Sequence, residues 1–327
     1  MAKVFVTGAS GFVGSNLCHK LIELGYEVVA MVRANSNLLG LKMFSGKIVH
    51  GDILEEKNLS QLMEGADFVF HTAGLVTFDN SRREELFRVN VEGTRTVMSA
   101  ALHAGVKKMV HTSSVAAVGI PSVSNIADET IEYNKFKYNV GYADSKHFGE
   151  VEVETAVQRG LNAVVVNPAS IVGQRDVYSH FGILLRVLKG KKMVPYLGGG
   201  MCVVGIDDVV DGEIAALRMG RTGERYILGS ENISFKDLFR KIGEVVGASK
   251  PNVYVPIWTA KVAASFLEIL SDITGKPPVL TKAHVASATL LHYFSFEKAK
   301  KELGFEPKPI IAAIRKAYEW YIENGLM

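Results

Sequence analysis

The sequence predicts an α/β protein with a doubly wound parallel sheet and a smaller, mostly helical C-terminal lobe. Over the first two-thirds of the chain, short β-branched runs alternate with helical stretches, a pattern typical of βαβ units. The runs are almost continuously apolar, as expected for strands that helices cover on both faces. This alternation stops after Asn167, so a second unit of different architecture is expected to begin there.

Six apolar runs predict strands, and the segments between them predict helices. The strands are expected over residues 3–7, 27–32, 47–50, 67–71, 108–113 and 162–167. The helices are expected over residues 14–24, 58–63, 84–104 and 142–158, where apolar residues recur at helical spacing. Several of these helices end near a glycine, which is a common stop signal.

The last 160 or so residues divide less clearly into strands and helices. Residues 168–205 are expected to be rich in loops, 207–218 to form a helix and 225–228 one more strand. From Ser234 onward the chain is expected to be helical, with a break at Pro277-Pro278. We therefore expect a nucleotide-binding domain of residues 1–170 with about 203–229, and a substrate-binding lobe of residues 171–202 and 230–327.

The composition favours a cytoplasmic globular enzyme. The net charge is only +3, and no run of five like charges occurs, so nucleic-acid binding is not expected. Two cysteines and nine histidines show neither a disulfide framework nor metal-ligand spacing, so we expect a reducing compartment and no metal. The first apolar run is too short for a signal peptide. Residues 255–270 contain Lys261 and Glu268 and are expected to form a helix of the lobe rather than a membrane span.

A glycine-rich turn follows the first predicted strand. Residues 7–14 read Thr-Gly-Ala-Ser-Gly-Phe-Val-Gly. Glycines allow a tight turn, a close approach of the backbone to a pyrophosphate, and close packing of helix on strand. The N-terminus of the next helix then offers free N–H groups and partial positive charge to phosphates. The residues expected to bind a dinucleotide here are Gly8, Ser10, Gly11, Phe12, Val13 and Gly14.

The end of the second predicted strand indicates which dinucleotide is bound. Enzymes that use NAD commonly place a carboxylate at this point to hold the ribose hydroxyls, but here Val32 and Arg33 occupy it. Arg33, with help from Ser36, is suited to the 2′-phosphate of NADP. The alternative is that Arg33 stacks on adenine and discriminates little, so NADP(H) is the preferred prediction and NAD(H) stays open.

A Tyr-x-x-x-Lys pair predicts general acid–base chemistry. Tyr142 and Lys146 lie four residues apart on a predicted helix and therefore share a face. A nearby ammonium and a positively charged nicotinamide both favour the phenolate, which moves the proton affinity of the tyrosine toward the operating pH. Ser113 and Ser114 end the fifth strand at the same edge of the sheet. His71 and His111 close adjacent strands and are expected to bond to backbone groups, and Asp144 is expected to face solvent.

With these motifs in place, the chain resembles an extended short-chain dehydrogenase/reductase over essentially its whole length, and within that group the dihydroflavonol-reductase-like and NAD-dependent epimerase/dehydratase branch. Further matching segments include residues 51–53, 71–74, 90–94, 167–173 and 204–209. The resemblance implies a Rossmann fold and a catalytic set of Ser114, Tyr142 and Lys146. Ser114 is preferred over Ser113 because the serine of related enzymes lies five residues before a glycine, here Gly119.

The same resemblance implies further contacts with the cofactor. It places Asp52 and Ile53 beside the adenine, and Ala73 and Gly74 beside the centre of the dinucleotide. Asn90 is expected either to steady the active site or to serve as a buried structural asparagine. The remaining residues that the resemblance assigns to the cofactor site are Thr112, Asn167 and Pro168, with Tyr142 and Lys146 themselves.

Three functions fit these residues. The leading one is NADPH-linked reduction of a ketone or aldehyde, or the reverse oxidation, on a small-molecule substrate. A nucleotide-sugar epimerase with tightly held NAD would use the same trio, although the missing ribose carboxylate disfavours it. A non-catalytic NADP-binding redox sensor is a third possibility, disfavoured because both Tyr142 and Lys146 are present. The resemblance also implies a homodimer, and Tyr133, Phe136 and Tyr138 are expected either to line an apolar substrate pocket or to pack as a loop.

Overall fold

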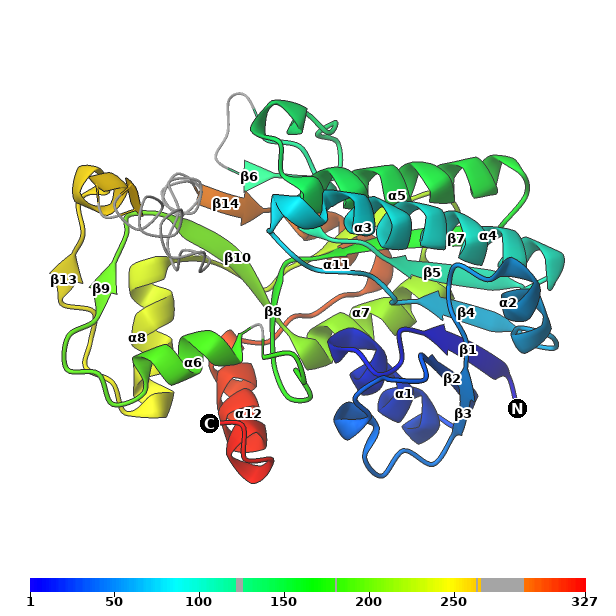
Figure 1. Cartoon of the computed structure of the whole chain (residues 1–327), viewed down its shortest axis with the longest axis horizontal. Helices are drawn as coiled ribbons and strands as arrows, with labels where there is room; N and C mark the ends of the chain where they lie inside the picture. Colours follow the sequence, from blue (N-terminus) through cyan, green and yellow to red (C-terminus); the bar gives the residue numbers. More distant parts are fainter. Residues whose placement is uncertain (122–125, 180, 263, 266–290) are drawn as a thin grey trace.

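The computed structural model describes residues 1–121, 126–179, 181–262, 264–265 and 291–327. Its centre is a sheet of seven parallel strands in the order β11-β7-β5-β4-β1-β2-β3 (Figure 1). The strand bounds are β1 Lys3–Thr7, β2 Glu27–Val32, β3 Lys47–His50, β4 Phe68–His71, β5 Lys108–Thr112, β7 Ala163–Pro168 and β11 Arg225–Leu228. The predicted doubly wound Rossmann sheet is confirmed, because the strand order reverses between β1 and β4.

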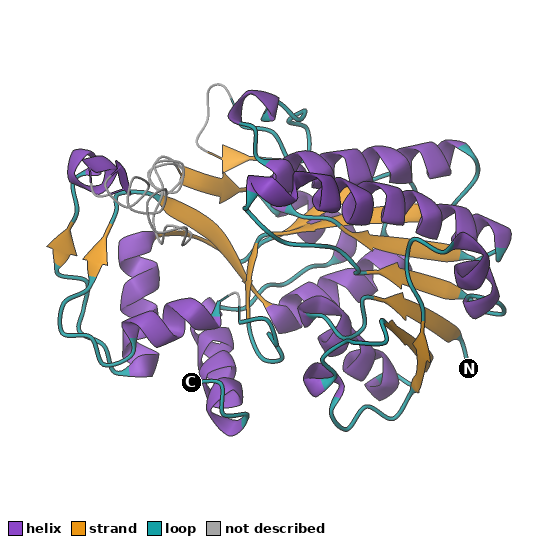
Figure 2. Ribbon diagram, viewed as in Figure 1, coloured by secondary structure: helices purple, strands orange, loops and turns teal. Residues whose placement is uncertain are grey.

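Helices cover both faces of this sheet (Figure 2). Successive side chains of each strand point alternately to these two layers of helices. On one face Val4 and Val110 pack with helices α1 and α7, and on the other Phe5 and Met109 pack with α2, α4 and α5. The bounds are α1 Phe12–Glu23, α2 Glu56–Leu62, α4 Gly93–His103, α5 Gly141–Gln158 and α7 Ile206–Met219. Two buried faces explain why the strand sequences show no polar alternation.

The predicted helix over residues 84–104 is interrupted. It consists of α3 (Arg83–Phe87), a π-helical turn η3 (Arg88–Glu92) and α4. A π turn inserts one extra residue, and such insertions are often found at functional sites. Here the turn contains the buried Asn90.

Residues 168–205, which were expected to be rich in loops, also contain four regular elements. This stretch contains β8 (Ser170–Val172), α6 (Gly182–Leu188), β9 (Pro195–Tyr196) and β10 (Gly200–Gly205). The glycines suggested a loop, but Gly200 lies in β10. A Cβ at this position would meet the carbonyl oxygen of Ile233 at 2.6 Å, so glycine is required there. Glycine at this position marks close backbone approach rather than a turn.

The C-terminal lobe therefore contains a second sheet as well as helices. Its strands are ordered β12-β10-β14-β6, with β8 beside β10. The new elements are β6 Ile126–Ala127, β12 Glu231–Ser234, β14 Leu291–Phe294, α8 Phe235–Val246, α11 Glu297–Leu303 and α12 Ile310–Glu323, and β13 (Val253–Tyr254) pairs with β9. These strands escaped prediction because they are short and pair with partners far away in sequence. The predicted break at Pro277-Pro278 and the end of the predicted helix 255–270 lie outside the described residues.

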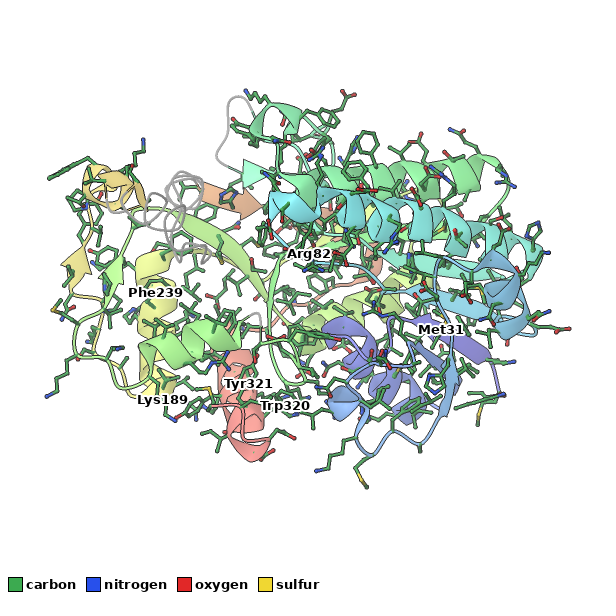
Figure 3. All side chains as sticks on the ribbon, in the orientation of Figure 1. Met31, Arg82, Lys189, Phe239, Trp320 and Tyr321 are labelled. Carbon is green, nitrogen blue, oxygen red and sulfur yellow. The ribbon has the colours of Figure 1, made fainter. Side chains whose placement is uncertain are left out.

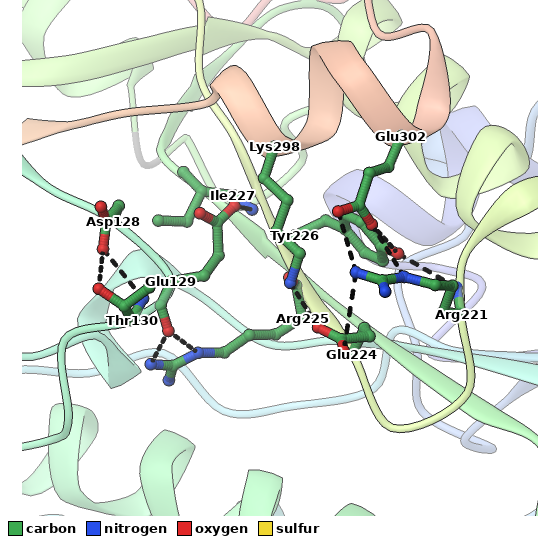
Figure 4. Close-up of polar contacts among 10 residues, drawn as sticks. All are labelled: Asp128, Glu129, Thr130, Arg221, Glu224, Arg225, Tyr226, Ile227, Lys298 and Glu302. Atoms are coloured by element: carbon green, nitrogen blue, oxygen red, sulfur yellow. Dashed lines mark hydrogen bonds and ion pairs between the residues drawn. The ribbon is translucent and has the colours of Figure 1, made fainter.

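An edge network ties the segment before α5 to the large sheet (Figure 4). The side chain of Glu129 accepts a hydrogen bond from the edge-strand N–H of Ile227 at 2.8 Å. Arg225, on the same strand, donates to the carbonyl oxygens of Glu129 and Ile131. The edge of β11 is thus covered by the loop that leads to α5, the helix that contains Tyr142.

Helix α12 is anchored in the lobe by one buried phenol (Figure 3). The hydroxyl of Tyr321, which is fully buried, donates to Oδ2 of the buried Asp176 at 2.6 Å. The same carboxylate oxygen accepts the N–H of Phe181 at 3.0 Å. Burial and the neighbouring carboxylate both raise the pKa of Tyr321, so the phenol stays a donor.

Tyr321→Phe is expected to lower the free energy of unfolding by about 1.5–3 kcal/mol, because it removes a hydrogen bond to a buried charged group. Urea unfolding followed by circular dichroism measures this. Tyr318→Phe, one turn earlier and half-buried, serves as the control and should change stability little. Equal stabilities of the Tyr321→Phe variant and the wild type would contradict the anchor.

Candidate active site

The carboxyl ends of β1, β4 and β5 bring the predicted site residues to one edge of the sheet. Thr7 pairs in register with His71, and His71 with His111. The residues that follow these strands are Gly8, Ala73-Gly74 and Ser113-Ser114. This edge lies at the point where the strand order reverses, which is where open α/β sheets form a ligand crevice.

The glycine turn is shaped by close contacts. Gly8 has a φ of +68°, and a Cβ there would lie 2.5 Å from the backbone nitrogen of Ala73. At Gly14 a Cβ would lie 2.3 Å from the carbonyl oxygen of Gly8. Glycine is required at both places, because β1, β4 and α1 approach here without room for a side chain.

The start of α1 fits a pyrophosphate. Gly11 precedes the helix without a side-chain cap, and the first turn contains no acidic residue. The first N–H groups of the helix are therefore left free for an anion. Ser10 is buried in this turn, and Phe12 and Val13 are half-buried in the first turn of the helix.

Tyr142 lies in the first turn of α5 and is 9% exposed. Burial raises the pKa of its phenol, and a hydrogen bond with the Ser114 side chain opposes that rise. The neighbouring Ser113 is directed elsewhere, because its hydroxyl donates to Glu150. Of the two serines, Ser114 is the one that the fold places beside the tyrosine.

Lys146 is buried one turn further along α5. Its Nζ donates to the carbonyl oxygen of Thr112 at 3.0 Å. Burial lowers the pKa of Lys146 to about 8, and the charges of Glu150 and Glu213 oppose that effect. A Cβ on Gly74 would lie 3.3 Å from this Nζ and 3.2 Å from Oδ1 of Asn90, so glycine lets the loop after β4 approach the ammonium closely. The free N–H groups of α1 offer a site for phosphates, and the ammonium at the same sheet edge offers a donor for a ribose hydroxyl, as a dinucleotide needs.

Asn90 uses both ends of its amide for positioning. Its Oδ1 accepts the N–H of Leu75 at 2.8 Å, and its Nδ2 donates to the Leu75 carbonyl and to Oγ of Ser145. The side chain thus connects the loop after β4 to α5. Asn90 is 3% exposed and is therefore a buried structural asparagine, and the same contacts hold together the loop after β4 and the helix α5 that carry the site.

Two further predicted residues lie at the end of β7, and one of them bonds to the backbone of Ser114. The Nδ2 of the buried Asn167 donates to the carbonyl oxygen of Ser114 at 2.9 Å and to Glu150. Pro168 ends β7 beside it and is also buried. Thr112 offers its carbonyl to Lys146, while its hydroxyl donates to Glu213 on the opposite side of the sheet.

The residues predicted for the adenosine end lie apart from the trio, around β2 and β3. Arg33 is exposed immediately after β2, where its backbone N–H donates to Oγ of Ser36 at 3.1 Å. Asp52 is half-buried and accepts the N–H of Leu54. Ile53 is buried against Gly93 of α4. The crevice therefore extends across the sheet edge from β5 to β2.

Two predictions about polar residues are wrong. Asp144 does not face solvent: its side chain is 2% exposed, and it accepts hydrogen bonds from Arg83 at 2.8 Å and from the Tyr133 hydroxyl. His71 bonds to two threonine hydroxyls rather than to backbone, and His111 has no hydrogen-bond partner among the described residues.

Sequence reasoning missed the carboxylates around Lys146. Glu213 is fully buried on α7, and its Oε2 has no partner within the described part of the chain. Burial raises the pKa of Glu213 to about 7, and the Thr112 hydrogen bond and the charge of Lys146 oppose that rise. One signal was present: Glu213 lies four residues after Val209, on the apolar face of the helix.

Comparisons with known proteins agree with this geometry. Residues 4–229 match the NAD dependent epimerase/dehydratase family, and the chain belongs to that family. It is accordingly an NAD(P)-dependent oxidoreductase of the extended short-chain dehydrogenase/reductase type.

Three similar proteins span nearly the whole chain. A Synechocystis protein that bears the name dihydroflavonol 4-reductase is 36% identical, covering 98% of this chain and 95% of its own. Sterol demethylase protein B of Methylococcus capsulatus is 31% identical, covering 98% and 99%. The crystal structure of gox2253 is 35% identical with a TM-score of 0.86, covering all of both chains.

Glu213→Gln is expected to make stability less dependent on pH. A glutamate whose pKa rises from 4.5 to about 7 on folding contributes stability that is fully present below pH 4.5 and is lost as the pH rises through 7. That loss amounts to about 3 kcal/mol at pH 8, and glutamine avoids it while still accepting from Thr112.

Urea unfolding of the wild type and the variant at pH 5 and pH 8 measures the difference. The variant should gain on the wild type at pH 8. Asp211→Asn, which removes an exposed carboxylate from the same helix, should show no such gain. A Glu213→Gln variant whose stability follows the wild type at both pH values would contradict the assignment.

Proposed function

We propose that the enzyme reduces a ketone or aldehyde with NADPH, or runs the reverse oxidation, with Tyr142 as general acid/base. The observation that carries this proposal is the pairing of the Tyr142 and Ser114 hydroxyls one turn of α5 away from the buried ammonium of Lys146. Two hydroxyls and an ammonium at one point are suited to a carbonyl oxygen that gains negative charge and then a proton.

Each residue of the trio has a separate task. Tyr142 gives its phenolic proton to the substrate oxygen in reduction and takes it back in oxidation. Ser114 donates to the same oxygen and polarises the carbonyl. Lys146 holds the ribose of the cofactor and supplies positive charge that favours the phenolate. When bound, the nicotinamide cofactor supplies or accepts the hydride.

We infer a preference for NADP(H) from the end of β2. Arg33 is exposed there next to Ser36, and no carboxylate follows the strand to hold ribose hydroxyls. A guanidinium and a hydroxyl form a suitable pair for a 2′-phosphate. NAD(H) as cofactor is the alternative.

An apolar ring-bearing substrate fits the mouth of the site. Phe78 lies edge-on to Tyr142 with ring centroids 5.6 Å apart, and it is 68% exposed. Val76, on the same loop, is also exposed. Exposed apolar side chains next to a reactive group favour a substrate that buries them. The names of the two relatives, one a flavonoid-type reductase and one a sterol-acting protein, point the same way.

The proposal extends to the roles of the two lobes, the cellular compartment and the oligomeric state. We infer that residues 1–170 with about 203–229 bind the dinucleotide, and that residues 171–202 and 230–327 close over the substrate. A cytoplasmic enzyme is inferred from the two unpaired, buried cysteines Cys18 and Cys202. A homodimer through α4 and α5 is supported by the exposed Phe148 and Val151 on α5. No helix among the described residues is long and apolar enough to span a bilayer.

The second candidate is a nucleotide-sugar epimerase, which the family description favours. Such an enzyme oxidises and re-reduces one carbon with a cofactor that it does not release. Absorbance and nicotinamide fluorescence of the purified protein separate the two functions. Empty protein that binds NADPH reversibly supports the reductase, whereas protein that retains NAD through purification supports the epimerase.

Tyr142→Phe is expected to lower kcat by about 10²- to 10⁴-fold, because it removes the transferable proton. The Kd for NADPH, measured by nicotinamide fluorescence, should stay close to that of the wild type. Tyr138→Phe, at an exposed tyrosine of the preceding loop, should leave both quantities unchanged. Full turnover by Tyr142→Phe would exclude the proposed mechanism.

Arg33→Ala is expected to weaken NADPH binding by roughly 10- to 100-fold, the value of one charge-assisted hydrogen bond. Binding of NADH should change little, because it has no 2′-phosphate, and it therefore serves as the internal control. Both affinities come from fluorescence titration at one ionic strength. Equal losses for the two dinucleotides would indicate that Arg33 stacks on adenine instead.

A further inference from the structure

One end of the C-terminal lobe exposes large apolar side chains and buries small ones. Residues 257–262 are helical and follow β13. Ala260 and Ala264 are buried against Leu197 and Val255. The large residues of the same helix point outward instead: Trp258 is 69% exposed and Val262 63%. Core-facing helices of globular proteins show the opposite arrangement.

The neighbouring pair of parallel strands, β9 and β13, extends this surface. β9 and β13 pair in register at Tyr196 and Tyr254, and Tyr254 is 53% exposed. The loop before β9 is held to the one before β13, since Asn252 donates to the carbonyl oxygen of Lys192 at 3.1 Å. Met193 in this loop is 68% exposed. In Figure 1 these elements form the end of the molecule opposite β3.

Lysines dominate the two segments that build this end. Residues 189–206 and 245–265 contain no Asp or Glu, and the exposed Glu244 in the last turn of α8 directly precedes the second segment. Their lysines, all exposed, are Lys189, Lys191, Lys192, Lys250 and Lys261. We call the surface made by Met193, Tyr254, Trp258, Val262, Lys191, Lys192, Lys250 and Lys261 the end face.

We propose that the end face docks on the surface of an anionic lipid bilayer. Exposed Trp, Tyr and aliphatic side chains together with exposed lysines match the interface of such a membrane, where aromatic rings lie at the headgroup level and lysines meet the anionic lipids. A protein partner would need acidic groups and a shaped apolar surface, whereas a bilayer supplies both charge and apolar depth without shape. This proposal does not depend on which carbonyl substrate the enzyme uses.

The chain carries its own reporter for the test. Its two tryptophans are Trp258 on the end face and Trp320 on α12. In a Trp320→Phe variant, all tryptophan fluorescence therefore arises from the proposed contact. The probe is vesicles of phosphatidylcholine with about 30 mol % phosphatidylglycerol, compared with pure phosphatidylcholine.

Insertion predicts a blue shift of the Trp258 emission and its quenching by brominated lipids, with the anionic vesicles only. In the same background, Lys191→Gln with Lys192→Gln should weaken partitioning by about 25-fold, from roughly fivefold per lysine. Lys42→Gln with Lys47→Gln removes the same charge at the far end, next to β3, and should reduce partitioning far less.

Three results would overturn the proposal. The first is an emission spectrum that anionic vesicles do not change. The second is emission that is already blue without lipid, because the chain itself covers Trp258. The third is a blue shift that grows with protein concentration alone, which would assign the end face to a second copy of the chain.

Discussion

The buried ammonium of Lys146 is the constraint on which the rest of the site depends. Its bond to the Thr112 carbonyl fixes α5 against the end of β5. An unpaired buried charge is costly, and here Glu150 and Glu213 offset part of that cost from the two sides of the sheet. The same charge helps to lower the pKa of His71 to about 3, which keeps this neighbour neutral. The local electrostatics are thus organised around one cation at the crevice.

Helix α5 can reach this position because small residues let it approach the π turn. A Cβ on Gly149 would lie 2.8 Å from the carbonyl oxygen of Asn90. Asn90 in turn bonds to Ser145 on α5 and to the loop after β4. The π turn contains Asn90, whose amide reaches both the loop after β4 and helix α5. Asn90 therefore links the packing of the helices to the geometry of the site.

The sequence predicted well those features that depend on local pattern. Apolar runs identified all seven parallel strands within a few residues, because strands covered by helices are mostly apolar. The glycine turn and the Tyr142–Lys146 spacing were equally clear in the sequence, since each reflects a local geometric need.

What the sequence did not reveal depends on contacts between distant segments. Asp144 follows Tyr142 by two residues and would be exposed on a simple helix, but Arg83 and Tyr133 cover it from other elements. Gly200 is needed in β10 because the Ile233 carbonyl approaches it closely. Glu213 is buried against a sheet of which six strands precede α7. Apart from Tyr133, these partners lie outside any window of twenty residues, so periodicity could not find them.

A crystal structure of the enzyme with bound NADP⁺ tests the central claim most directly. The pyrophosphate should lie at the free N–H groups of α1, and a ribose hydroxyl should bond to Nζ of Lys146. The nicotinamide should lie next to the Tyr142 and Ser114 hydroxyls. A dinucleotide bound in this crevice with its ribose out of reach of Lys146 would contradict the role assigned to the buried ammonium.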